Sequence, residues 1–349
     1  MRILQIEDEP WDSGIAHYAL TLSSQLQRLG HEVSFWGRAG SPLISAAQRA
    51  GLRARGLRRP WSSLHGLRAQ VRAAGIELIN AHTGSGHALA AALAAMTTVA
   101  VVRTRGDARP VAKHPLARLL ARRTDAYIAA NSAIARELAA AFWGSRVATV
   151  FQGIAAGPAL PLPEDCVFGL LGRLDPVKGH ETLLRAAALL KKDHPAIRLR
   201  AVGGGAPLRR TQLESRARAL GLEGCVEFTG FAADVPAELA RCRVGVVAST
   251  GSEAVSRAAL EWMAAGRPLV ATAVGGLPDL VDEGVTGFLL PPGDPQSLAR
   301  ALARFLEQPA LAERLGGAAR RVFEERFSLE RFGAETMKVY GQVLGHLPS

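Results

Sequence analysis

The sequence predicts an α/β protein built of two doubly wound domains, each a parallel sheet covered by helices. Short apolar runs alternate with longer segments in which apolar residues recur at helical spacing, almost throughout the chain. A stretch rich in proline and glycine, residues 152–164, interrupts this alternation and reads as a linker. At 349 residues, the chain is also too long for one ordinary hydrophobic core.

The first domain is expected to start with an apolar strand over 3–6 and a helix that follows Asp12-Ser13-Gly14. Ile15, Ala19, Leu22, Leu26 and Leu29 recur on one face of that helix, and Gly30 suits its end. The remaining strands expected in this domain are 32–36, 77–81, 99–103, 126–130 and 147–150, and the remaining helices are 43–50, 87–96, 115–123 and 133–141.

A second alternating series follows the linker. Its expected strands are 167–171, 197–202, 226–229, 244–247, 269–271 and 287–289, and its expected helices are 181–192, 208–220, 256–265, 295–307 and 311–325. We therefore predict domains over 1–158 and 164–328, with a C-terminal helix within 329–349 that returns toward the first domain. Ligands of such domains bind beyond the carboxyl ends of the strands.

The formal net charge of +11 comes mostly from arginine in the first half of the chain. A coding bias toward arginine and alanine would account for part of this arginine content. The basic half nevertheless favours anionic lipid head groups or a phosphorylated acceptor as partners. No nucleic acid is expected, because no zinc spacing, recognition helix or basic strand interleaved with aromatics is present. The residues concerned are Arg49, Arg53, Arg55, Arg58, Arg59, Arg68, Arg72, Arg103, Arg105, Arg109, Lys113, Arg118, Arg122 and Arg123.

The expected location is the cytoplasm, either free or associated with the cytoplasmic face of a membrane. No apolar run is long enough for a transmembrane helix. The first strand leads directly into Glu7, Asp8 and Glu9, which does not resemble a signal peptide. Cys166, Cys225 and Cys242 have neither metal-binding nor disulfide spacing.

The segment 172–179, GRLDPVKG, follows a predicted strand and therefore lies at an edge where ligands bind. Arg173 can bind two phosphate oxygens, and Lys178 adds a mobile charge. Gly172 and Gly179 permit close approach of the backbone. Taken alone, the motif also fits a plain strand–turn–helix with surface charges.

A second motif, 249–261, follows the strand 244–247. Glu253 precedes a helix, and it can accept hydrogen bonds from sugar hydroxyls, while Ser252 or Ser256 can cap that helix. The helix start suits a diphosphate. Glu261 lies in the helix and can reach a ribose diol, although an ordinary half-exposed helix charge is the alternative. Together the two motifs indicate a site for a nucleotide-activated sugar.

The chain resembles the family 4 retaining glycosyltransferases of GT-B fold along essentially its whole length. Glu253 and Glu261 carry the resemblance together with GHEV at 30–33, GI at 153–154, GRL at 172–174, KG at 178–179, VGGGAPL at 202–208, VEFTGF at 226–231, AAGRPLV at 264–270, GG at 275–276, Pro278 and GFL at 287–289.

This resemblance implies roles for individual residues. Arg173 and Lys178 would hold the donor diphosphate, with Gly172 close by, and Glu253 would position the transferred sugar. Gly14 would approach the phosphates or the acceptor. The other implied donor contacts are the backbone of Ala254, Val255 and Ser256, the ribose ligand Glu261, and Phe231 with the residues up to Pro236 beside the base.

The chain departs from the family pattern in its first domain. One glycine, Gly14, stands where relatives often have two, and Gly106 stands where many carry a histidine that contacts the transferred sugar. Arg105 or Asp107 would substitute for that histidine. His82, at a strand end, is either a substrate contact or a structural histidine.

We therefore predict a retaining glycosyltransferase that moves a sugar from a nucleoside-diphosphate donor to a hydroxyl of a glycan or lipid-linked acceptor. A front-face reaction without metal or cofactor is expected, because the basic clamp takes the place of a metal. The alternatives are a sugar-nucleotide 2-epimerase on the same scaffold and a non-catalytic module that binds nucleotide sugars or glycans.

Overall fold

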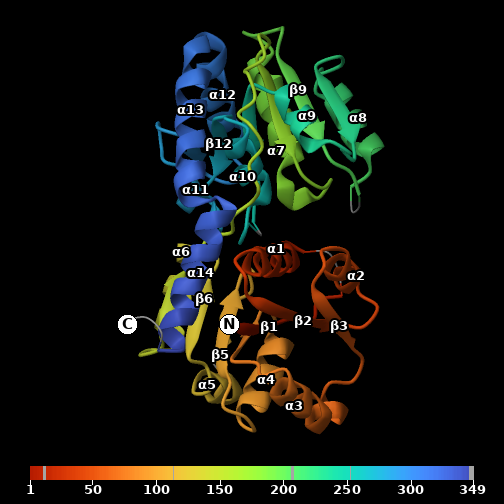
Figure 1. Cartoon of the computed structure of the whole chain (residues 1–349). Helices are drawn as coiled ribbons and strands as arrows, with labels where there is room; N and C mark the ends of the chain where they lie inside the picture. The colour runs from red at the N-terminus through yellow and green to blue at the C-terminus, as the bar shows by residue number, and fades with distance from the viewer. Residues whose placement is uncertain (11–12, 113, 206–207, 252, 346–349) are drawn as a thin grey trace. The chain divides into compact units, whose positions relative to one another are not determined.

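The computed structural model describes residues 1–10, 13–112, 114–205, 208–251 and 253–345 (Figure 1). The chain divides into two compact units. Unit 1 contains Met1–Gly153 and the segment from Leu329 onward, and unit 2 contains Ile154–Ser328. Each unit is a parallel sheet with helices, which confirms the predicted fold class.

In the described part of unit 1, seven parallel strands lie in the order β3-β2-β1-β4-β5-β6-β7. Its strands are β1 (Arg2–Glu7), β2 (Glu32–Arg38), β3 (Arg53–Leu57), β4 (Leu78–Ala81), β5 (Ala100–Arg105), β6 (Ala126–Ala129) and β7 (Val147–Thr149). Its helices are α1 (Gly14–Arg28), α2 (Pro42–Arg49), the 3-10 turn η1 (Trp61–Ser63), α3 (Leu64–Ala73), α4 (Gly84–Ala94), α5 (Pro115–Ala121), α6 (Ser132–Ala141) and α14 (Leu329–Val343).

In the described part of unit 2, six parallel strands lie in the order β10-β9-β8-β11-β12-β13. These are β8 (Val167–Leu171), β9 (Arg198–Val202), β10 (Val226–Gly230), β11 (Val244–Val247), β12 (Leu269–Thr272) and β13 (Gly287–Leu290). The helical elements are η2 (Pro176–Lys178), α7 (His180–Leu190), α8 (Arg210–Ala219), α9 (Val235–Ala240), α10 (Arg257–Ala264), α11 (Leu277–Leu280), α12 (Pro295–Glu307) and α13 (Pro309–Arg326).

Both sheets reverse their strand order once. In unit 1 the chain moves outward from β1 through β2 to β3, and then returns to place β4 on the other side of β1. In unit 2 the corresponding reversal lies between the neighbouring strands β8 and β11. Such a reversal is called a switch point. The loops that follow two such strands diverge to opposite faces of the sheet, so the carboxyl ends of β1 and β4 and of β8 and β11 are the expected ligand sites.

The last helix, α14, packs against the first helix of unit 1 (Figure 1). Phe332 lies edge-on to Tyr18, with 4.7 Å between the ring centroids. The absence of a side chain at Gly333 permits this approach, because a Cβ there would lie 2.9 Å from Leu29 Cδ1. The final segment therefore completes the core of unit 1.

The expected elements occur with shifts of at most three residues at their ends; one strand, three α-helices and the 3-10 turns η1 and η2 were missed. Strand β3 was missed because its sequence, RARGL, has no apolar run, and it lies at the edge of the sheet. Helix α3 was missed in the same arginine-rich region. The two others are the short helices α9 and α11. Ser13 caps α1 as expected, and Asp12 lies outside the described residues.

Trp262 of α10 is fully buried against the centre of the unit 2 sheet. Two glycines that pair across neighbouring strands, Gly169 of β8 and Gly245 of β11, make room for its indole ring. A Cβ at Gly245 would lie 2.4 Å from Trp262 Cγ, and one at Gly169 would lie 2.5 Å from Trp262 Cη2. These two glycines fix how closely α10, which carries Glu261, approaches the sheet.

Among the described residues, none of the helices combines the length and the apolar character that crossing a bilayer requires.

We predict that Gly245→Ala lowers the free energy of unfolding by about 1–3 kcal/mol, because the new methyl group overpacks the site of Trp262. Urea unfolding followed by circular dichroism measures the effect. Gly317→Ala is the matched control: Gly317 lies exposed in α13, where a Cβ would meet nothing closer than 3.8 Å. That control should be neutral or stabilising. Equal losses in both variants would contradict the packing argument.

Candidate functional site

The switch point of unit 2 holds a buried carboxylate. Glu253 follows β11 and is 2% exposed, and its Oε1 accepts hydrogen bonds from Lys178 Nζ at 2.5 Å and from Ser249 Oγ at 2.6 Å. Lys178 ends the turn that follows β8, so the two predicted motifs meet through this ion pair. The pairing offsets the cost of burying the charge of Glu253.

The backbone around Glu253 leaves no space for additional side chains. Gly276 donates its N–H to the carbonyl of Glu253 at 2.7 Å, and a Cβ on Gly275 would lie 2.2 Å from the same oxygen. Gly179 adopts φ +75°, and a Cβ there would lie 1.9 Å from the carbonyl oxygen of Ala248. The loops after β8, β11 and β12 are therefore held together by close backbone contact at positions where glycine is required.

Arg173 lies in the turn after β8 and is the more accessible cation of the predicted clamp. Its side chain is 66% exposed, and Nη2 lies 3.5 Å from Asp175 Oδ2. Asp175 also accepts a hydrogen bond from the backbone N–H of Val177 at 3.1 Å, which orders the turn. A guanidinium in this position retains most of its donors for an incoming anion.

Glu261 is paired rather than isolated in its helix. Arg257, one turn earlier, donates from Nε to Glu261 Oε1 at 2.8 Å. Ser256 occupies the N-cap position of α10, but its hydroxyl makes no capping hydrogen bond. Ala254 and Ser256 are buried and Val255 is half-buried, whereas Ser252 lies outside the described residues.

Phe231 follows β10 and is 81% exposed. Its ring packs on Gly204, where a Cβ would lie 2.8 Å from the ring. Beside it, the carboxyl ends of β9 and β10 border a pocket of about 520 Å³ that includes Gly203, Gly204 and Gly205. A flat backbone surface next to an exposed ring suits the stacking of a planar group.

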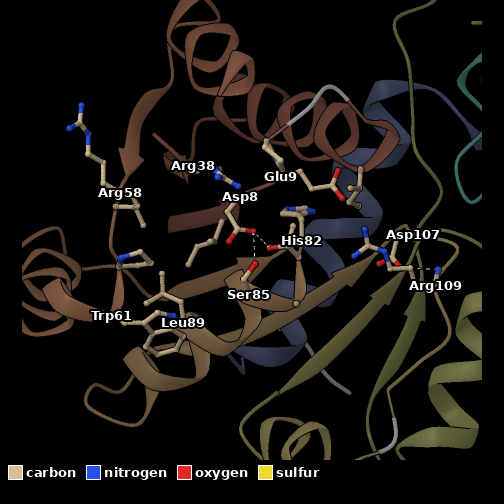
Figure 2. Close-up of a pocket in the computed structure, with 18 residues that line it drawn as sticks. Asp8, Glu9, Arg38, Arg58, Trp61, His82, Ser85, Leu89, Asp107 and Arg109 are labelled. Carbon is tan, nitrogen blue, oxygen red and sulfur yellow. Dashed lines mark hydrogen bonds between the residues drawn. The ribbon is translucent and has the colours of Figure 1, made fainter. Parts of the chain in front are cut away.

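Unit 1 has a larger pocket, of about 590 Å³, at its own switch point (Figure 2). Asp8 and Glu9 follow β1, and His82 and Ser85 lie at the end of β4 and the start of α4. Asp8 Oδ1 accepts hydrogen bonds from the hydroxyls of Thr83, which caps α4, and Ser85. Five residues that line this pocket were not predicted as site residues from the sequence: Asp8, Ser85, Arg38, Trp61 and Leu89.

His82 is almost fully buried in the wall of this pocket. Its Nε2 lies 2.7 Å from Gln5 Oε1, and since that oxygen only accepts, Nε2 carries the proton. Its Nδ1 has no hydrogen-bond partner among the described residues and is left as an acceptor. Burial, reinforced by Arg103, lowers the pKa of His82 to about 3, so the imidazole is neutral.

A chain of hydrogen bonds that ends at the last helix fixes the orientation of Gln5. The amide of Gln5 donates to Tyr340 Oη at 3.3 Å, and Asn80 Nδ2 donates to the same oxygen at 2.7 Å. Asn80 Oδ1 in turn accepts from the hydroxyl of Thr104 at 2.9 Å. Residues of β1, β4, β5 and α14 thus select the tautomer of His82.

Arg105 and Asp107, expected near the transferred sugar, pair with each other at 3.0 Å. Arg105 also donates to the carbonyl of Arg109, so its side chain stabilises the loop over residues 105–109. Asp107 lines the pocket, whereas Arg105 lines a neighbouring pocket of about 390 Å³. Gly14 is the first residue of α1 and is not among the residues that line either pocket.

The acidic side chains of the larger pocket are paired, whereas two of its basic side chains are not. Its carboxylates already have donors: Thr83 and Ser85 for Asp8, Ser13 for Glu9, and Arg105 for Asp107. The guanidinium groups of Arg38 and Arg109 make no hydrogen bond or ion pair with any other described residue. In Figure 2 the guanidinium of Arg38 lies among the other lining side chains, whereas that of Arg58 extends away from them. The pocket therefore offers unused donors.

Two family models match the chain in succession. "Glycosyltransferase Family 4" covers residues 13–156, and "Glycosyl transferases group 1" covers residues 165–308. The chain belongs to the family 4 glycosyltransferases. Its membership confirms the resemblance on which the sequence prediction rested.

Among curated proteins, the chain is 38% identical over 162 residues to a D-inositol 3-phosphate glycosyltransferase of Streptomyces griseus, which is 44% of this chain and 34% of that protein. It is 33% identical over 241 residues to the enzyme of the same name from Streptomyces scabiei, which is 61% of this chain and 54% of that protein. The chain thus spans about a third to a half of the length of these relatives.

Among solved structures, HepE of Anabaena in complex with UDP matches with a TM-score of 0.87 at 21% identity, over 98% of this chain and 100% of that chain. HepE has also been solved with UDP-glucose. At this identity the likeness supports the fold alone, which is that of GT-B proteins.

One buried acid directly precedes the pocket residues Asp8 and Glu9 in the chain. Glu7, at the end of β1, accepts the N–H of Glu9 at 3.0 Å through Oε1, and its Oε2 has no partner among the described residues. Burial raises the pKa of Glu7 to about 8, although the N–H of Glu9 and the charge of Arg103 oppose the rise. At neutral pH this carboxyl is mainly protonated.

Glu7 therefore predicts a pH dependence of stability. Its pKa is higher in the folded chain than in the unfolded chain, so its burial is tolerated at low pH and destabilises the fold increasingly as pH rises from about 4.5 to about 8. Glu7→Gln should match the wild type near pH 5 and exceed it by a few kcal/mol near pH 8.5, by urea unfolding.

The difference between variant and wild type is the quantity to follow, because buried histidines act in the opposite direction. His82 and His87 have pKa values lowered to about 3, and they destabilise the fold as pH falls below 6.5. Their effect cancels in the comparison. A difference between Glu7→Gln and wild type that does not change with pH would show that Glu7 ionises normally.

Proposed function

We propose that this chain is a retaining glycosyltransferase that uses a nucleoside-diphosphate sugar as donor. The observation that carries the proposal is the buried Glu253 carboxylate, held by Lys178 and Ser249 at the switch point of unit 2. It brings together in one site a carboxylate that would bind the sugar and a cation that would bind the diphosphate. The UDP and UDP-glucose found with HepE support a donor of this class.

In the proposed reaction, the bond between the anomeric carbon and the diphosphate oxygen breaks, and the electron pair leaves with the diphosphate. The acceptor hydroxyl forms the new bond from the same face and passes its proton to the departing phosphate oxygen. Arg173 and the two remaining N–H donors of Lys178 would stabilise the charge that develops on that group. Glu253 would orient the sugar, and Glu261 would bind the ribose of the donor.

No metal or cofactor is proposed for this reaction. In the described ranges, no group of three or more His, Cys, Asp or Glu side chains is arranged to hold a metal ion. The proposal itself rests on Arg173 and Lys178, which supply the positive charge that a leaving diphosphate requires.

The acceptor is proposed to be a hydroxyl of a glycan or lipid-linked molecule that carries an anionic group. The unit 1 pocket supports this assignment through its two unpaired guanidinium groups, those of Arg38 and Arg109. His82, neutral and held in one tautomer by Gln5, forms part of the wall of the same pocket. The name of the curated relatives, which specifies an inositol phosphate, agrees with an anionic acceptor.

We also propose peripheral contact with an anionic membrane on its cytoplasmic face. The net charge supports it, because unit 1 carries 21 basic and 11 acidic side chains whereas unit 2 carries 21 and 20. Almost all of the excess positive charge therefore belongs to the unit with the acceptor pocket.

A thermal-shift panel of UDP, GDP, ADP and CMP tests the donor site. At 100 times its Kd, the correct nucleotide should raise the Tm by about 5 °C or more. Arg173→Ala should reduce nucleotide affinity by about 10-fold to 100-fold, because it removes a charge-assisted contact without disturbing the buried Lys178–Glu253 pair. Arg241→Ala, an exposed arginine elsewhere in unit 2, is the matched control and should bind like the wild type.

Three outcomes separate the proposal from its alternatives. No shift with any nucleotide would contradict the donor site. Binding without turnover of the matching sugar nucleotides on a panel of anionic and neutral acceptors would favour a non-catalytic module. Conversion of the sugar nucleotide to its 2-epimer without an acceptor, followed by NMR, would favour the epimerase.

A further inference from the structure

Helix α5 is unusual in unit 1 because none of its residues is buried. Leu116 is 57% exposed and Leu119 is 56% exposed. Trp143, just beyond the end of α6, is 97% exposed. Folded chains seldom leave several large apolar side chains this exposed at one place unless the surface meets a partner.

These apolar side chains belong to one region of the surface. Leu116 and Leu120 of α5 line the 390 Å³ pocket together with Leu138 of α6 and Phe142, and Trp143 is the next residue along the chain. We use the name docking face for the exposed set formed by Leu116, Arg118, Leu119, Arg122, Arg123 and Trp143.

The docking face is strongly basic. Residues 108–124 contain five arginine or lysine residues and no aspartate or glutamate. Arg118, Arg122 and Arg123 are exposed, and their side chains make no hydrogen bond or ion pair with any other described residue. Exposed leucine and unpaired arginine at α5, with an exposed tryptophan just beyond α6, are the kinds of side chain found in segments that lie in a membrane interface.

From these observations we propose that the docking face binds unit 1 to the surface of an anionic lipid bilayer. Leu116, Leu119 and Trp143 would enter the boundary between head groups and acyl chains. Arg118, Arg122 and Arg123 would bind the lipid phosphates, with their aliphatic stems against the apolar layer. A bilayer satisfies both halves of this surface, whereas a purely apolar partner would leave the arginine charges unpaired.

The docking face also has a route to the larger pocket of unit 1. The 390 Å³ pocket beneath α5 shares Gly84, Asp107 and Arg109 with the 590 Å³ pocket. A lipid-linked acceptor held at the membrane would find apolar side chains next to α5 and polar side chains beyond Arg109. This last link rests on the proposed glycosyl transfer, whereas membrane docking does not.

Sedimentation with vesicles tests the proposal independently of activity. The full chain is mixed with vesicles of phosphatidylcholine alone, or of phosphatidylcholine with 30% phosphatidylglycerol, at about 0.1 M salt. We expect binding to the anionic vesicles only. The triple variant Arg118→Gln/Arg122→Gln/Arg123→Gln should lower the partition coefficient by about 100-fold. Leu119→Ser/Trp143→Ser should lower it by at least 10-fold.

A matched charge control separates a specific face from general basicity. Arg241→Gln/Arg314→Gln/Arg321→Gln removes the same charge from exposed positions of unit 2 and should bind vesicles like the wild type. Circular dichroism and the unaltered nucleotide thermal shift of each variant verify that it is folded. Quenching of tryptophan fluorescence by brominated lipid should occur in the wild type and largely disappear in Trp143→Phe.

Several results would overturn the proposal. These are absence of binding to anionic vesicles, equal losses in the two arginine triples, and quenching that persists in Trp143→Phe. If Leu119→Ser/Trp143→Ser converts a dimer to a monomer by light scattering and leaves vesicle binding intact, the face joins two copies of the chain instead. Loss of vesicle binding with unchanged nucleotide binding supports docking even where transfer activity is absent.

Discussion

The buried carboxylate of Glu253 is the constraint around which the described loops of unit 2 are arranged. A carboxylate that is 2% exposed must be paired, and the loops after β8 and β11 supply Lys178 and Ser249 for that purpose. Thr272 of β12 holds the carbonyl of Ser249 through its hydroxyl at 2.5 Å, and Gly276 binds the carbonyl of Glu253. Three strand ends are thereby tied to one charge, which leaves Arg173 accessible beside it.

Unit 1 has a switch point of the same kind, but the side chains gathered there differ. Its switch point between β1 and β4 holds a pocket whose carboxylates already have donors and whose guanidinium groups of Arg38 and Arg109 do not. His82 is kept neutral with a single tautomer by Gln5, which Tyr340 of α14 orients. The unit 2 sheet thus presents the paired carboxylate and the cations that the proposed diphosphate-sugar donor requires, while the unit 1 sheet presents the unpaired guanidinium groups that the proposed anionic acceptor requires.

The sequence predicted the parts of these sites that follow strands, because strand ends are visible as breaks in the apolar pattern. It named Lys178 and Glu253 separately but not their contact, since residues 75 positions apart meet only through the strand order. Arg38 was missed because the predicted strand ended at 36, two residues before the end of β2. Trp61 was missed because β3, RARGL, has no apolar run that would reveal the elements around it. Tyr340 lies 260 positions from Asn80, and no local sequence pattern could predict the hydrogen bond between them.

Hydrogen–deuterium exchange of the full chain with and without saturating UDP tests the central claim most directly, since it locates the nucleotide without altering any residue. The account predicts slower exchange in peptides that cover residues 172–179 and 249–261, and unchanged exchange in peptides that cover 82–89 and 105–112. Protection confined to the unit 1 peptides, or no protection in either unit, would contradict the assignment of the diphosphate site to Glu253 and Lys178.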